Sequence, residues 1–468
     1  MAIDRKNRLA EALFEPVDAA SVAAFRIGFG LLMVVAVARF FAHGWIDEYF
    51  LTPRYFFPYF GFEWVRPWPG AGMHIHFAAM GLLALLIAAG AFYRVTVALF
   101  AVLFAYAHLI DKTNYLNHYY LLICLSFLMA FLPLHRVASV DGWRMRPPPS
   151  PRVPAWVLWA IRAQVGIVYV FGGIAKLKHD WLVEAQPMRI WLAANTDFPL
   201  LGPLFDERWV APAFSYAGAA FDLSIVPLLL WRRSRPFAYA AGVLFHLITA
   251  RLFQLGMFPW IMIASSLIFF PPDWPRRALA RLGWKPRERE EAPRPWPPPA
   301  PRHRPAVLAA LGLYFGFHLL MPLRHFLYPG DVCWTEQGFR FSWNVMLMEK
   351  NGSSEFRVTE PSTGRSWIVA PTDYLTRYQA KMMASQPDMI LQLAHLIAND
   401  FRSRGVRDPE VRVDAFAALN GRRHARLIDP GVDLARESER LLPKKWILPL
   451  ASDARGRGAP IARREETP

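Results

Sequence analysis

The stretch VLWAIRAQVGIVYVFGGIA, residues 157–175, is mostly apolar and close to the length of about 20 residues that a helix needs to cross a bilayer. Other runs of this kind lie at 21–43, 74–93, 95–110, 119–134, 213–231, 237–252, 255–271 and 306–323. The runs at 95–110 and across 237–271 are short or interrupted, so the number of spans could differ by one or two. We predict a polytopic α-helical membrane protein with about nine transmembrane helices.

The charge pattern predicts how these helices are oriented. The chain has 468 residues and a formal net charge of +16, yet only 19% of its residues are charged and 54% are hydrophobic. Most of the basic residues that flank the runs fall in alternate loops, at 5–8, 135–155, 232–235 and 272–305. By the positive-inside rule this face and the N-terminus are cytoplasmic. Basic residues in alternate loops do not form a nucleic-acid-binding face, so we exclude that class of function.

The sequence after residue 324 has a different character and should lie on the outer face, periplasmic or lumenal. Apolar and polar residues alternate over 339–371 around two turn signals, Asn351-Gly352 and Ser362-Thr363-Gly364, which predicts a three-stranded meander. Helical spacing follows at 373–403 and one more strand at 409–419. We therefore divide the chain into a helical membrane domain (1–324), a small extracytoplasmic α+β domain (325–440) and a flexible basic tail (441–468).

Several polar side chains are expected at the outer ends of the spans, where ionisable groups are costly and often functional. They are Asn117 and His118 before the run at 119–134, Lys176 after 157–175, His246 and Arg251 in 237–252, and His325 after 306–323. An amine among apolar neighbours loses stabilisation of its charged form, so Lys176 could act as a base near neutral pH. The alternatives are a lysine that reaches to the headgroups and histidines that only bond neighbouring helices.

No metal site is predicted. Cys124 and Cys333 are too few for a cysteine-built site, and His74 and His76 are two residues apart, so they face different sides of a helix. Arg26 lies within the first run, where we expect it to pair with a carboxylate or with carbonyls of a neighbouring helix.

Five segments in order resemble one known family. They are DKTNYLNHYY (111–120), VYVFGGIAKLKHDW (168–181), FHLITARLFQLGMFPWIMIASSLIFFPPDWPRR (245–277), RHFLYPGDVCWTEQGFRFSW (324–343) and RLIDPGVD (426–433). Together they resemble the vitamin K-dependent gamma-glutamyl carboxylases and their bacterial relatives, over about residues 16–436.

The resemblance implies an integral membrane enzyme that uses a reduced vitamin K hydroquinone or menaquinol, O2 and CO2. In this family a lysine deprotonates the quinol, and oxygenation to the epoxide creates a base that removes the γ proton of a peptide glutamate, which then takes up CO2. The motif match assigns the base to Lys176 and charge stabilisation to His118. It assigns His246, His325 and Trp334 to the substrate and quinol pocket, to which we add Asn117 and Arg251.

Departures from the family pattern leave other functions open. Thr249 stands where the family has an asparagine, and Phe339 stands at an aromatic hydroxyl position. The expected partners are the lipid bilayer, a quinol and a glutamate-containing peptide. The alternatives are a quinol epoxidase that acts on another substrate, and a quinone-binding membrane protein without catalysis.

Overall fold

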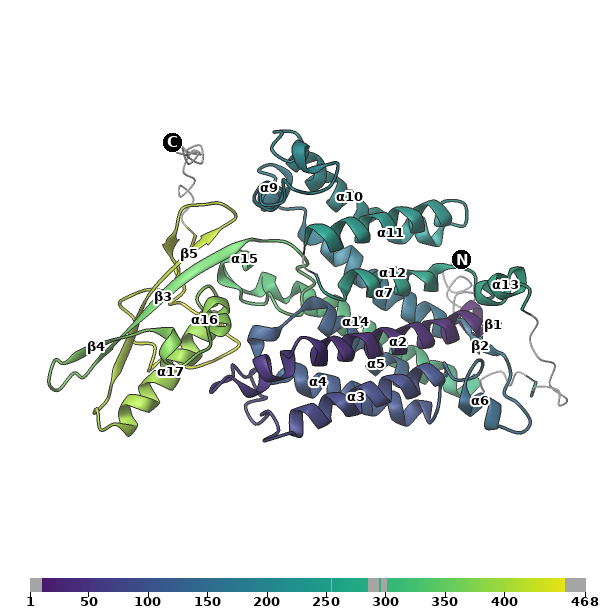
Figure 1. Cartoon of the computed structure of the whole chain (residues 1–468), viewed down its shortest axis with the longest axis horizontal. Coiled ribbons are helices and arrows are strands. Elements are labelled where there is room, and N and C mark those ends of the chain that lie inside the picture. Colours follow the sequence, from purple (N-terminus) through teal and green to yellow (C-terminus); the bar gives the residue numbers. More distant parts are fainter. Residues whose placement is uncertain (1–10, 254, 285–293, 296–300, 451–468) are drawn as a thin grey trace.

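The computed structural model describes residues 11–253, 255–284, 294–295 and 301–450. A bundle of roughly parallel and antiparallel helices forms one part, and a smaller region of strands and helices sits at one end of it (Figure 1). We call the end of the bundle that faces this C-terminal region the domain-facing end.

Each predicted run corresponds to a helix of the bundle. These helices are α2 (Ala20–Ala42), α3 (Gly72–Ala89), α4 (Tyr93–Leu109), α5 (Asn117–Phe131), α7 (Ala155–Ala175), α10 (Val210–Leu230), α11 (Arg235–Leu252), α12 (Phe258–Ser266) and α14 (Arg304–Leu323). Five of them, α2, α3, α7, α10 and α14, are long and apolar enough to cross a membrane. The structure thus has five candidate membrane spans among the described residues, and the count of about nine stays a prediction.

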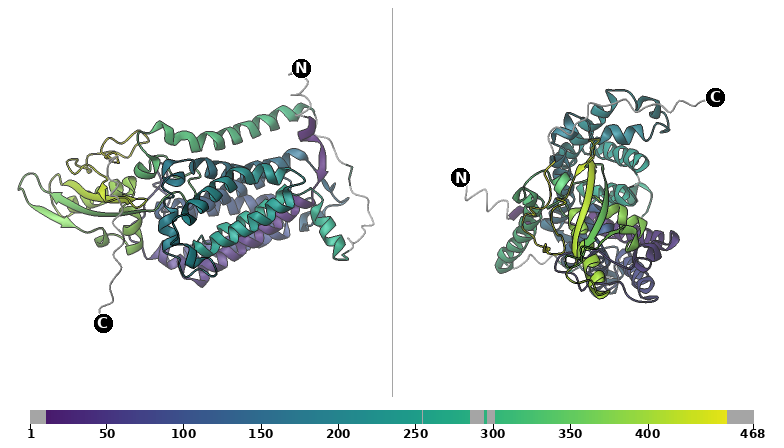
Figure 2. Two further views of the ribbon diagram at one scale, coloured as in Figure 1. Left: turned by 90° about the horizontal axis from the view of Figure 1, so that it is seen from above. Right: turned by 90° about the vertical axis from the view of Figure 1, so that its left-hand side faces the viewer.

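Packing in the bundle depends on small residues where helices approach closely. A Cβ atom on Gly30 of α2 would lie 2.6 Å from the amide nitrogen of Ala88 in α3. Arg26 donates to backbone carbonyls of neighbouring segments, Leu134 and Ile87 among them, which confirms the expected pairing. Helix α14 runs along one side of the bundle, and only His318 and Pro322 of it are buried (Figure 2).

Shorter elements connect these helices. They are β1 (Pro16–Asp18), β2 (Arg152–Pro154), α6 (Val140–Arg144), α8 (His179–Leu182), α9 (Met188–Ala193), α13 (Trp274–Arg281) and α15 (Val332–Thr335), with the 3-10 or π segments η1 (Asp47–Leu51), η2 (Lys112–Asn114), η3 (Gly202–Leu204), η4 (Leu267–Phe269), η5 (Pro301–His303), η6 (Arg324–Leu327) and η7 (Pro371–Asp373).

The C-terminal region is an antiparallel sheet covered by two helices. The strand order is β4 (Ser366–Val369), β3 (Lys350–Thr359), β5 (Glu410–Leu419) and β6 (Ala425–Arg426), and the helices are α16 (Arg377–Met383) and α17 (Pro387–Ser403). The predicted α+β character, the turn at 362–364 and the strand at 409–419 are confirmed.

The three-stranded meander over 339–371 is wrong in its first half. Asn351 and Gly352 form no turn, because they lie inside β3, opposite Ala418 and Ala417 of β5. Residues 339–349 contain no strand. Gly352 is needed there for another reason: a Cβ atom on it would lie 2.6 Å from the carbonyl oxygen of Ala384.

The C-terminal region extends past residue 440. Trp446 and Ile447 are buried, and Ile447 bridges to Ile428. The backbone around them therefore packs on the C-terminal region, although the sequence assigned it to a flexible tail. The rest of that predicted tail, 451–468, lies outside the described residues.

Buried and half-buried charges join the two parts. Asp388 of α17 accepts from Lys112 Nζ in η2 at 2.9 Å and from Arg340 Nη1 at 2.7 Å. Asp180 in α8 is paired with Arg422 at 2.5 Å. Because the partners come from both parts, these ion pairs fix how the C-terminal region sits on the bundle.

Candidate active site

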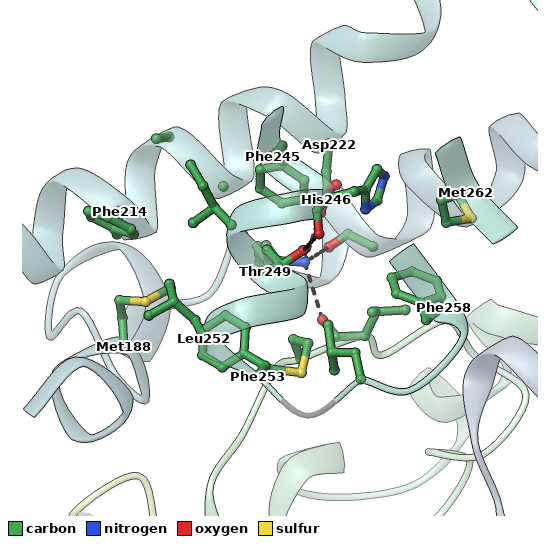
Figure 3. Close-up of a pocket in the computed structure, with 18 of the residues that line it drawn as sticks. Met188, Phe214, Asp222, Phe245, His246, Thr249, Leu252, Phe253, Phe258 and Met262 are labelled. Carbon is green, nitrogen blue, oxygen red and sulfur yellow. Dashed lines mark hydrogen bonds and ion pairs between the residues drawn. The ribbon is translucent and has the colours of Figure 1, made fainter. Parts of the chain in front are cut away.

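A nearly apolar cavity of about 280 Å³ lies between α7, α10 and α11. In Figure 3, Asp222, His246 and Thr249 lie around it with Phe245 and Phe258. We call it the lysine cavity, because Lys176 is part of its lining.

The sequence explains why α7 and α10 meet here. A Cβ atom on Gly173 would lie 2.8 Å from the side chain of Leu223 and 3.0 Å from its backbone nitrogen, so only glycine permits this approach of the helices. The close approach sets Asp222 of α10 beside the end of α7. Lys176 caps that end, where the helical backbone stops.

Lys176 points inward. Its Nζ atom donates to Asp222 Oδ2 at 2.8 Å, to the Gly172 carbonyl at 3.2 Å and to the Val345 carbonyl at 3.2 Å. Only 4% of the residue is exposed, so it does not extend to the headgroups as the alternative interpretation required. Lys178 instead bonds Asp331 Oδ1 at 2.9 Å in a half-exposed pair.

His246 lies on the wall of the same cavity. Its Nε2 atom is 2.9 Å from the Tyr169 hydroxyl, which is 3.4 Å from Ser266 Oγ. Its Nδ1 atom is buried and has no partner among the described residues. One ring nitrogen therefore makes the helix contact that we considered, and the other is free to bond a ligand.

A second cavity, of about 1240 Å³, holds His118 and Asn117. We call it the histidine cavity. Leu255, Phe258, Val345 and Met346 line both cavities. The Phe258 ring is 6.0 Å from the His246 ring on one side and 6.0 Å from the His118 ring on the other. The two predicted groups Lys176 and His118 thus belong to adjoining chambers.

The remaining predicted residues line neither cavity. Arg251 is exposed and its guanidinium lies 5.8 Å from the Phe198 ring. His325 Nδ1 is 2.7 Å from the Pro322 carbonyl, and Trp334 Nε1 donates to the Leu448 carbonyl at 2.8 Å. The partners in these contacts lie outside both cavities, so the structure does not bring the three residues into the pocket that the resemblance implied.

Sequence reasoning missed Asp222, Tyr169 and Ser266. A sign of Asp222 was present, since it is the one carboxylate within the apolar run at 213–231 and an ionisable group in a span is a functional candidate. The sequence gives no such indication for the hydroxyl groups of Tyr169 and Ser266. Within the described residues no group of three or more histidine, cysteine or acidic side chains could hold a metal ion.

Fold and cavities together define a helical protein with candidate membrane spans, a lysine enclosed in an apolar cavity and a C-terminal α+β region. A family model described as the HTTM domain matches residues 14–274, more than half of the chain. A second, described as the vitamin K-dependent gamma-carboxylase lumenal domain, matches residues 303–453. No solved structure matches the chain.

The chain therefore belongs to the vitamin K-dependent gamma-carboxylase family, and the resemblance seen in the five sequence segments is confirmed. The family implies vitamin K-dependent chemistry, and its second domain is of a lumenal type.

Proposed function

We propose that this protein is a membrane enzyme that couples oxygenation of a reduced naphthoquinol, vitamin K hydroquinone or menaquinol, to carboxylation of a peptide glutamate with O2 and CO2. The observation that carries the proposal is the enclosed amine of Lys176, held at 2.8 Å from Asp222 in a nearly apolar cavity.

The lining of the lysine cavity suits a quinol ring. Phe245, Phe258 and Met262 offer apolar surface to a flat aromatic ligand. Lys176 Nζ and the free Nδ1 of His246 are polar groups that a quinol hydroxyl could bond. A bound quinol supplies, on oxygenation, a base strong enough for a glutamate γ proton, which an amine is not.

In this proposal Lys176 reacts as the neutral amine: the extra proton of its ion pair with Asp222 first leaves to the outer aqueous phase, and Nζ then takes a hydroxyl proton from the quinol. The carboxylate of Asp222 attracts the ammonium that forms, while the carbonyls of Gly172 and Val345 fix the direction of Nζ. His246 orients the ligand from α11. The apolar wall excludes water, which would otherwise consume a strong base.

The same proposal includes an orientation. The two cavities lie toward the domain-facing end of the bundle, since Val345 and Met346 of the C-terminal region help to line them. If the N-terminus is cytoplasmic, this end is periplasmic or lumenal. A quinol would then enter from lipid and a peptide from the outer aqueous phase.

The test is turnover by the purified protein in detergent. Vitamin K hydroquinone and menaquinol are each supplied with O2, labelled CO2 and a glutamate peptide, and epoxide and labelled peptide are measured. Lys176→Ala should abolish both products. Lys178→Ala is the matched control, because its partner Asp331 lies outside both cavities, and it should retain both.

The outcomes separate the candidate functions. Lysine-dependent epoxide with labelled peptide supports the carboxylase. Lysine-dependent epoxide without label supports a quinol epoxidase that acts on another substrate. Folded wild-type protein that binds quinol but forms no epoxide is a quinone-binding protein, and the proposal is then wrong.

A further inference from the structure

The histidine cavity has a polar end made where three helices terminate. Arg39 is in the last turn of α2, His108 is in the last turn of α4, and His118 is in the first turn of α5. All three line the cavity, whereas its other end is lined by apolar groups such as Met33 and Met80. Neither Arg39 nor His108 was predicted from the sequence as a site residue.

His108 is the first sign of a ligand. It is 6% exposed, and neither of its ring nitrogens has a hydrogen-bond partner among the described residues. Its neighbours are aromatic rings, with Tyr115 at 5.5 Å and Tyr59 at 5.7 Å between ring centroids. Buried polar groups are nearly always bonded in folded proteins, so an imidazole without partners that lines a cavity indicates a missing partner there.

The lining of the histidine cavity indicates the sign of that partner, because it contains the cation Arg39 and no carboxylate among the described residues. Arg39 packs over the Trp45 ring at 5.4 Å and makes no ion pair with a described residue. By contrast, Lys112 and Arg340 nearby are neutralised by Asp388 and Glu439. Helix α5 begins at the same place without a side-chain cap, so the positive end of its dipole adds to the charge of Arg39. An anion is the ligand that this end suits.

We propose that the polar end of the histidine cavity binds the side-chain carboxylate of the peptide substrate, with Arg39 as its counter-charge and His108 as a hydrogen-bond donor. The inference rests on the proposed function and adds a division of labour to it: the quinol occupies the lysine cavity and the carboxylate the histidine cavity. Phe258, which contacts both chambers, stands between the two reactants.

The position of the polar end fits a peptide that comes from the C-terminal region. Tyr378 of α16 lines the cavity, and its ring is 5.5 Å from that of Tyr49 in η1. Its hydroxyl donates to the Thr113 carbonyl at 3.1 Å. The wall of the cavity is thus built from both parts of the molecule, as a site for a peptide held by the C-terminal region requires.

The experiment measures binding and turnover separately. A short peptide with one glutamate between leucines is titrated into the detergent-solubilised protein, and its glutamine counterpart serves as the uncharged probe. Arg39→Gln and His108→Phe are compared with wild type, and Arg39→Lys tests whether charge alone restores binding. Arg54→Gln is the control, an exposed arginine of the same bundle that lines neither cavity. Thermal unfolding identifies variants that fail to fold.

We expect Arg39→Gln to weaken binding of the glutamate peptide by about tenfold or more, a typical loss for a charged hydrogen bond, and to leave the glutamine peptide unaffected. Arg39→Lys should recover part of this loss. In turnover assays the KM for the peptide should rise while the KM for the quinol stays constant. Equal binding of the glutamate peptide by folded Arg39→Gln, or a rise in the KM of the quinol instead, would overturn the inference.

Its failure is distinguishable from failure of the proposed function. If the wild type binds the glutamate peptide through Arg39 but forms no epoxide, the carboxylate site is supported and the enzymatic function is rejected. If Arg39→Gln carboxylates the peptide normally, the enzymatic function is supported and the carboxylate site is rejected. A wild type that neither binds the glutamate peptide nor turns over rejects both.

Discussion

Replacing Asp222 by asparagine removes one charge from the lysine cavity and almost nothing else. Asparagine has the same shape and can still accept a hydrogen bond from Lys176 Nζ, which lies 2.8 Å from Asp222 Oδ2 in the wild type. The carbonyls of Gly172 and Val345 stay in place at 3.2 Å. A change in rate would therefore report the charge of Asp222.

The size of the effect follows from Coulomb's law. Two unit charges about 4 Å apart attract each other by about 4 kcal/mol at an effective dielectric constant of about 20. The amide dipole and the two carbonyls replace part of this attraction, so about 2 to 4 kcal/mol of stabilisation of the new ammonium is lost. If proton uptake by Lys176 limits the rate, epoxide formation should slow by roughly 30-fold to 1000-fold.

The assay is the initial rate of epoxide formation at saturating quinol, for Asp222→Asn and for Asp222→Glu, which restores the charge. Asp331→Asn is the matched control, since Asp331 pairs with Lys178 at 2.9 Å outside the cavities. A folded Asp222→Asn protein whose rate is within about threefold of wild type would refute a counter-charge role for this carboxylate.

Three further predictions concern binding and stability. His246→Phe removes a ring nitrogen without a partner from the cavity wall and should raise the KM for the quinol by about tenfold, the worth of one hydrogen bond, as steady-state kinetics would reveal. Burial opposes ionisation of Asp388, but Arg340 and Lys112 outweigh it and hold the pKa of that carboxyl well below its usual value. The stabilisation that ionised Asp388 gives to the fold is then complete above about pH 4 and fades as the pH falls further. Asp388→Asn should therefore lower the free energy of unfolding by about 3 to 5 kcal/mol at pH 7, and the difference in Tm from wild type should narrow in acid. Gly30→Ala brings a Cβ atom to 2.6 Å from the Ala88 amide and should destabilise the α2 and α3 pair by about 1 to 3 kcal/mol in thermal unfolding, whereas Gly28→Ala meets open space and should not.

Local patterns predicted the elements whose form depends on local chemistry. The apolar runs became helices, and the alternation at 409–419 became β5, which has every second residue buried. The turn predicted at Asn351-Gly352 was wrong because an Asn-Gly pair is a strong turn signal when it is considered in isolation. In the fold Gly352 serves the approach of the Ala384 backbone, a contact that only the tertiary structure reveals.

The site was predictable in part for a similar reason. Lys176 and His118 stand at helix ends, which the lengths of the runs locate. The partner of Lys176 is Asp222, which is 46 residues away and is brought near by helix packing. His246 and Arg251 are five residues apart on α11, or about 140° around the helix, so one faces the cavity while the other faces outward. The run alone did not indicate which of the two would face inward.

Val345 and Met346 border both cavities, and the Val345 carbonyl bonds Lys176. These residues follow α14 and belong to the second of the two matched family segments. Neither matched segment alone therefore supplies all the residues that line either cavity. Exchange of the C-terminal half between relatives would alter the immediate surroundings of the amine as well as the choice of peptide, so the two halves should evolve as one unit rather than as interchangeable modules.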